Sequence, residues 1–187
     1  MTGAVVGLDA GWQDRAEAEH VLGRASDLCG NVVLACTHVL DSHWTGSLQL
    51  SGPAPDPGLL ARSVGAAVTT LTAAARSNAG PDEWAGRAAR AAAAMSTRSG
   101  GRAVVFPGQE NLVGEVDTDA VPILSAITEV VGIAGTPTAG TRLITRDHVR
   151  PVLLGGQLVL QVRPFGAGSA VAPFEVPNPT PCCATHG

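Results

Sequence analysis

The residues best suited to chemistry in this sequence are cysteines and histidines that form two short groups. The first group contains Cys36, His38 and His43, and the second contains Cys182, Cys183 and His186. Residues two apart on a strand project from one face, so Cys36 and His38 can bind one ion together. If the C-terminal group folds back onto this strand, the two groups supply a Cys2His2 or Cys3His site. The spacing therefore suggests a site for zinc or another transition metal.

The same residues also have a purely structural interpretation. A cysteine without a disulfide partner is among the most deeply buried residue types, so Cys36 fits a small core position. His38 would then be a hydrogen-bonded neighbour, and Cys182 and Cys183 an incidental pair on a loop. The sequence leaves both interpretations open, and with them the question of whether the protein is an enzyme.

A third group of polar residues is acidic. Glu115, Asp117 and Asp119 alternate along a segment that precedes an expected helix. Carboxylate oxygens at this spacing suit Mg²⁺ or Ca²⁺. We favour the alternative that Asp117 or Thr118 caps the helix and that Asp119 interacts with its positive N-terminus.

The basic residues exclude several mechanisms. All twelve cations are arginine, because the sequence contains no lysine. A Schiff-base amine, a Walker A lysine and the ATP-positioning lysine of protein kinases are chemically required to be lysine. The usual Gly-x-Ser-x-Gly nucleophile elbow of α/β-hydrolases is also missing. Enzymes that depend on these groups are therefore excluded.

The overall composition indicates an associating protein. Charged residues are 15% of the 187 residues and apolar residues 45%, whereas about 25% charge is usual. A surface this poor in charge predicts a homo-oligomer or a partner subunit. The net charge of −4 and the scattered arginines argue against nucleic acid. With no apolar stretch that could cross a membrane and no secretory leader, we expect a soluble cytoplasmic protein, of bacterial origin by its arginine-only usage.

Apolar periodicity and turn residues define the expected elements. Strands are expected over 3–8, 31–40, 46–50, 102–106, 141–146 and 152–163, and helices over 13–28, 60–75, 81–98 and 118–131. In the second of these helices, Leu60, Val64, Val68 and Leu71 form the inner stripe. In the last strand Gly155 and Gly156 suit a bulge.

This order predicts an α+β fold. We expect a single-domain α/β sandwich over residues 1–163, with a start compatible with the ferredoxin-like fold and a C-terminal β-hairpin. Residues 164–187 should form an irregular, proline-rich tail. The expected function is a non-enzymatic assembly or binding subunit of a homo- or hetero-oligomer. The alternative is a small metal- or thiol-dependent enzyme or sensor that uses the Cys/His site.

Overall fold

The structure is a computed structural model that describes residues 3–133, 135, 137–166 and 170–176. The chain divides into two compact units. The first unit contains Met1–Pro107 and Pro151–Leu158, and the second contains Gly108–Arg150 and Val159–Gly187. The single domain expected over residues 1–163 spans parts of both units. Composition and periodicity report local structure, so they carried no sign that the chain leaves the first unit at Pro107 and returns at Pro151.

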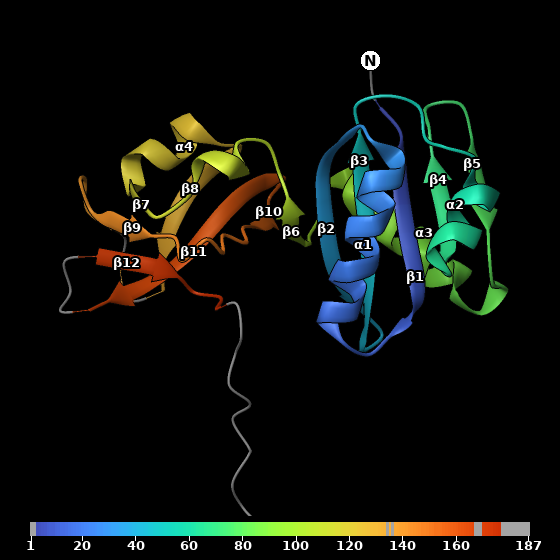
Figure 1. The fold of residues 1–187 in the computed structure, drawn as a ribbon, viewed down its shortest axis with the longest axis horizontal. Coiled ribbons are helices and arrows are strands. Elements are labelled where there is room, and N and C mark those ends of the chain that lie inside the picture. The colour runs from blue at the N-terminus through green and yellow to red at the C-terminus, as the bar shows by residue number, and fades with distance from the viewer. Residues whose placement is uncertain (1–2, 134, 136, 167–169, 177–187) are drawn as a thin grey trace, which may run out of the picture. The chain divides into compact units, whose positions relative to one another are not determined.

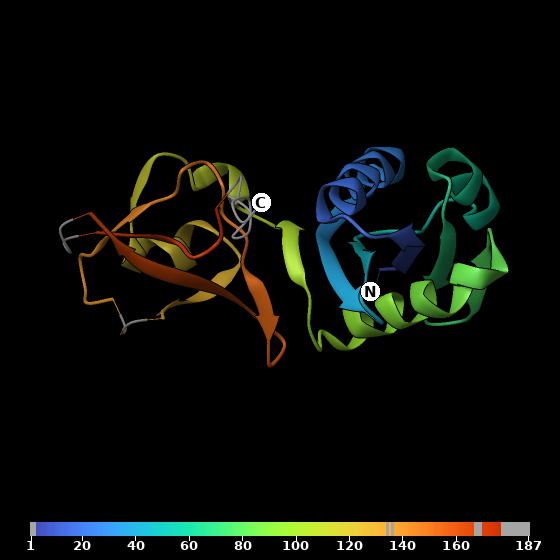
Figure 2. The ribbon, with the colours of Figure 1, turned by 90° about the horizontal axis from the view of Figure 1, so that it is seen from below.

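The first unit is built on an antiparallel sheet. Its strands lie in the order β5 (Arg76–Ala79), β4 (Ala67–Leu71), β1 (Val5–Trp12), β3 (His43–Leu50), β2 (Val32–Leu40), β6 (Arg102–Val105) and β10 (Val152–Leu154). Helices α1 (Arg15–Cys29) and α2 (Pro57–Val64) cover one face, and α3 (Asp82–Thr97) covers the other (Figures 1 and 2). The unit therefore has three layers, with the sheet in the middle.

The expected helix over 13–28 is confirmed as α1, and its ends have clear causes. The Asp14 carboxylate accepts a hydrogen bond from the Ala16 N–H at 2.6 Å, which satisfies one of the free donors of the first turn. At the other end, Gly30 takes a left-handed conformation with φ of 67° and its N–H bonds to the Ser26 carbonyl. The apolar stripe between these ends lies in the core under the sheet.

The expected helix over 60–75 is wrong beyond its first turns. Helix α2 ends at Val64 because Gly65 adopts φ of 69° and caps it. The next residues form β4 instead, as their β-branched side chains favour. Leu60, Val64 and Val68 are still buried in one core, but they reach it from a helix and a strand. The apolar residues therefore keep a helical spacing from α2 into β4, although the chain is no longer helical there.

The expected helix over 118–131 is also wrong. A 3-10 turn at Thr118–Ala120 leads into the single turn α4 (Val121–Leu124), with Pro122 in its first turn. Ser125 is extended, with φ of −147° and ψ of 176°, and its hydroxyl accepts the N–H of Ile127. The β-branched segment that follows forms β8 (Ile127–Gly132).

The second unit is rich in strands. Its sheet has the order β7 (Glu115–Asp117), β9 (Arg142–Ile144), β12 (Ala170–Pro173) and β11 (Gln157–Phe165), and β8 also pairs with β11. The β9–β12 pair is parallel, and β7–β9 and β11–β12 are antiparallel. Leu158, Leu160 and Val162 of β11 are buried, and so is Val159 on the other face of the strand.

Two expectations about the C-terminal third need correction. Gly155 and Gly156 are not a bulge inside one strand: both have positive φ and they separate β10 from β11. Residues 170–173, expected in an irregular tail, form β12 beside β11. Four residues are too few to show a period, so only the partner strand reveals β12. The expectation of an α+β protein is confirmed. No helix among the described residues is long and apolar enough to cross a membrane.

Candidate functional site

Cys36 and His38 lie together on the face of the first sheet that α3 covers. The His38 Nε2 is 2.6 Å from the Ser47 Oγ, and Ser47 pairs directly with Cys36 across β2 and β3. Gly101, which follows α3, closes over both side chains. A Cβ at Gly101 would lie 2.7 Å from the His38 Cε1 and 3.0 Å from the Cys36 Cβ, so only glycine fits this position. The result is a closed group of Cys36, His38, Ser47 and Gly101, which we call the Cys36–His38 cluster.

Burial controls the protonation of this cluster. Removal from water raises the pKa of the Cys36 thiol to about 12, against a smaller opposing effect of the Arg98 and Arg102 guanidinium groups. Burial also lowers the pKa of His38 to about 4. Near pH 7 the cluster therefore holds a thiol and a neutral imidazole. The thiolate is the form of cysteine that attacks substrates or binds metals, so these residues as placed are suited to hydrogen bonding and packing.

Of the remaining residues of the expected metal site, the structure describes only His43. His43 begins β3, and its Nδ1 donates to the carbonyl oxygen of Asp41 at 2.8 Å. Cys182, Cys183 and His186 lie outside the described residues, so the combined site remains a prediction. Within the described part of the chain, no group of three or more His, Cys, Asp or Glu side chains is arranged to hold a metal ion.

The acidic group of the second unit is engaged in structural contacts. Glu115 Oε2 forms an ion pair with Arg142 Nη1 at 2.8 Å, across β7 and β9. Asp119 Oδ2 accepts the Gly140 N–H at 2.9 Å, which ties the 3-10 turn to a distant loop. Asp117 occupies the capping position of that turn, but its side chain makes no capping hydrogen bond. The expected cap by Asp117 or Thr118 is therefore wrong, because a 3-10 turn and α4 replace the long helix and neither begins with a side-chain capping hydrogen bond.

Most of the polar residues beneath α3 were not predicted from the sequence. Asp9 is completely buried, where it accepts from the Arg87 Nε at 2.7 Å and from the Gly11 N–H at 3.0 Å. On neighbouring strands, Thr69 Oγ1 donates to Asn78 Oδ1 at 2.9 Å, and Thr45 Oγ1 is buried without a hydrogen-bond partner among the described residues. The alternation of Thr45 and Ser47 with apolar residues along β3 was a signal that this face is polar.

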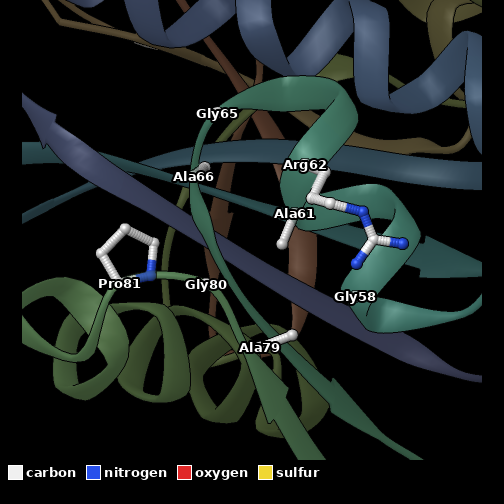
Figure 3. Close-up of a pocket in the computed structure, with 8 residues that line it drawn as sticks. All are labelled: Gly58, Ala61, Arg62, Gly65, Ala66, Ala79, Gly80 and Pro81. Carbon is white, nitrogen blue, oxygen red and sulfur yellow. The ribbon is translucent and has the colours of Figure 1, made fainter.

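The first unit also contains a pocket of about 430 Å³ between α2 and the turn that joins β5 to α3 (Figure 3). It is lined by small residues and one arginine: Gly58, Ala61, Arg62, Gly65, Ala66, Ala79, Gly80 and Pro81. Figure 3 shows the Ala61 methyl group directed towards the strand that carries Ala79, with the Arg62 side chain extending along α2 towards Gly58. The pocket is thus mainly apolar, with a cation on one side.

These features define an α+β protein of two compact units, with a closed polar cluster and a separate small-residue pocket in the first unit. In comparisons with protein-family models, curated proteins and solved structures, none matches the chain. The function must therefore be argued from these sites and surfaces.

Proposed function

We propose that the protein is a non-enzymatic assembly or binding subunit that associates with further copies of itself. The observation that carries this proposal is a pair of exposed aromatic side chains on one face of the second unit. Phe165 ends β11, and Phe174 directly follows β12. Both are at least one-third exposed, although aromatic side chains are among the residue types that gain most from burial.

The register of the two strands puts both rings on one face. The Phe174 N–H donates to the Gln161 carbonyl, and Gln161 is four residues before Phe165 on β11. Positions an even number apart share a face of a strand, so both phenylalanines lie opposite Leu160 and Val162, at the exposed ends of a face whose middle carries the buried Val159 and Ala172. We call this surface the aromatic face.

Arginines accompany the aromatic residues. Arg163 lies between the two phenylalanines on this face, and the Arg146 guanidinium carbon is 6.0 Å from the centre of the Phe165 ring. Aromatic residues and arginine are the types most enriched at the centres of protein interfaces. The cationic aromatic face of one copy also complements a chain whose net charge is −4.

The state of the Cys36–His38 cluster supports the non-enzymatic part of the proposal. Its thiol is protonated near neutral pH and its imidazole is enclosed beneath α3, so neither is placed to meet a substrate. A metal- or thiol-dependent enzyme or sensor is the second candidate, because Cys36 and His38 do project from one face. Zinc analysis of the purified full chain distinguishes the two, since stoichiometric metal that is lost in Cys36→Ser favours the second candidate.

The proposal also covers the fold type of the first unit, the cellular location and the kinds of partner. We infer a ferredoxin-like start, supported by the antiparallel strand order β4-β1-β3-β2 and by α1 and α2 on one face. Strand β5, helix α3 and strand β6 extend it. We also retain a cytoplasmic, bacterial setting and the absence of nucleic-acid and membrane partners as proposals.

Light scattering of the full chain over a wide concentration range tests the association. We expect a mass above 18.8 kDa, and a shift towards the monomer in Phe174→Asp, which puts a carboxylate into the apolar contact. Leu154→Asp is the matched control, because Leu154 is 52% exposed against 54% for Phe174 and lies in the first unit. A monomer at every concentration, or equal effects of the two substitutions, would contradict the proposal.

A further inference from the structure

We infer that the pocket between α2 and the β5–α3 turn binds a small organic monocarboxylate whose apolar body fills the pocket and whose carboxylate meets Arg62. The volume of about 430 Å³ falls in the range of ~300–1,000 Å³ that is usual for small-molecule sites. This binding activity is separate from association through the aromatic face.

The pocket is a product of backbone geometry. Gly80 has φ of +93°, and a Cβ there would lie 2.5 Å from the Ala66 carbonyl oxygen. Gly65 has φ of +69° because it ends α2. Larger side chains at these two positions would strain the backbone or collide with it. The chain therefore keeps this space open without relying on the rotamer of a large side chain.

The walls favour an apolar ligand body. Apart from glycines, the residues that line the pocket are Ala61, Ala66, Ala79, Pro81 and Arg62 (Figure 3). Ala61 and Ala66 are almost fully buried, so the apolar surface that a ligand can cover lies mainly on the half-buried Ala79 and the exposed Pro81. An alkyl group in this space removes apolar area from water on both sides of the contact.

Arg62 supplies the charge that selects the ligand. It is the only charged residue among those that line the pocket, and its guanidinium makes no hydrogen bond or ion pair with any described residue. A guanidinium presents paired N–H groups that match a carboxylate. The nearby Asp56 carboxylate accepts the Leu59 N–H at 2.7 Å and caps α2, and it forms no ion pair with Arg62.

The acidic residues after the pocket limit the charge of the ligand. Asp82 and Glu83 follow Pro81 at the start of α3. Negative charge on the residues that follow the pocket repels a multiply charged anion more strongly than a monoanion. A monoanion with an apolar body suits this balance better than inorganic phosphate does.

Hexanoate is the probe for this inference, with 1-hexanol as the neutral analogue and inorganic phosphate as the anion without an apolar body. In the full chain, the NMR methyl signals of Ala61, Ala66 and Ala79 should move with hexanoate and much less with the other two. Arg62→Gln should weaken hexanoate binding about tenfold, as expected for loss of one charge-assisted contact. Arg76→Gln is the matched control, because Arg76 lies on the adjacent β5 but does not line the pocket.

Ala79→Leu offers an independent test, because it fills the pocket and leaves Arg62 in place. It should abolish the hexanoate shifts while the remaining spectrum stays folded. The inference is overturned if hexanoate leaves the three methyl signals unmoved. It is also overturned if hexanol or phosphate binds as well as hexanoate, or if Arg62→Gln and Arg76→Gln bind it equally.

Discussion

The two faces of the first sheet are both buried, but they are built from different chemistry. The face under α1 and α2 carries large apolar side chains such as Val6, Leu8 and Leu48. The face under α3 carries mainly polar or small ones: Gly7, Asp9, Cys36, His38, Thr45, Ser47 and Thr69. Burial alone therefore does not require hydrophobic residues. Polar side chains are accommodated where hydrogen bonds and close backbone packing replace apolar area.

The helices differ in the same way. Helix α1 contributes Val21 and Leu22 to its core, whereas α3 contacts the sheet mainly through Ala88, Ala91, Ala92 and Met95. Small side chains let α3 approach closely: a Cβ at Gly7 would lie only 2.0 Å from the Ala88 carbonyl oxygen. We conclude that α1 is held mainly by apolar burial, and α3 by close fit and polar contacts.

The largest loss of stability should follow when a charged side chain replaces an apolar one on the face under α1 and α2. Val68 is 1% exposed beneath α2, so Val68→Asp buries an unpaired carboxylate. The expected loss is several kcal/mol, a large part of a typical stability of ~5–15 kcal/mol. Chemical denaturation measures it. Val39→Asp is the control at 59% exposure; comparable losses in the two variants would show that the apolar face is misassigned.

Acid should selectively weaken the polar face through His38. Its pKa is about 4 in the folded protein and 6.5 as the ordinary value, so the unfolded chain binds the proton more readily. The contribution of neutral His38 to the free energy of unfolding is complete above pH 6.5, and it is lost as the pH falls from 6.5 towards 4. The difference between the two pKa values of His38 corresponds to about 3 kcal/mol of stability. Denaturation of the parent protein and His38→Gln at several pH values measures this. The same acid dependence in both would rule out His38 as its source.

The close fit of α3 can be tested at Gly7. Gly7→Ala should push α3 from the sheet and cost about 1–3 kcal/mol, because the Ala88 carbonyl and the Ala92 N–H occupy the required space. Gly23→Ala makes the same change in α1, where nothing lies within 4 Å of the new methyl group. That variant should gain about 0.5–1 kcal/mol. Thermal unfolding distinguishes them, and a neutral Gly7→Ala would refute the close-fit model.

The smallest change in stability is expected at the turn between β2 and β3. This turn sets the register of the two strands and therefore which of their residues lie on the polar face. Asp41 and Ser42 form a two-residue hairpin loop with φ of 53° and 65°, the pattern of a type I′ turn. Ser42→Gly should relieve strain and add about 0.5 kcal/mol. Ser77→Gly on β5, without positive φ, should lose a similar amount. A lower melting temperature in Ser42→Gly would contradict this assignment.

The sequence predicted elements whose local signals agree with their surroundings. Helix α1 has an aspartate cap, an apolar stripe and a terminal glycine, and its position was predicted closely. The helix expected over 60–75 was wrong because spacing alone cannot show that Gly65 reverses the chain. At the candidate site, the shared face of Cys36 and His38 followed from strand alternation. Their enclosure by Gly101 could not, because that contact joins residues more than sixty positions apart.

Alkylation of Cys36 tests most directly whether the polar face is closed and chemically inert. Iodoacetamide at neutral pH, followed by peptide mass spectrometry, compares Cys36 with the half-buried Cys29 in the native protein and in denaturant. We predict that native Cys36 stays unmodified while Cys29 reacts, and that both react after unfolding, because only the thiolate is nucleophilic and burial raises the pKa of Cys36 further, to about 12. Rapid native labelling of Cys36 would instead indicate an accessible, activated thiol and contradict a binding protein with a closed polar face.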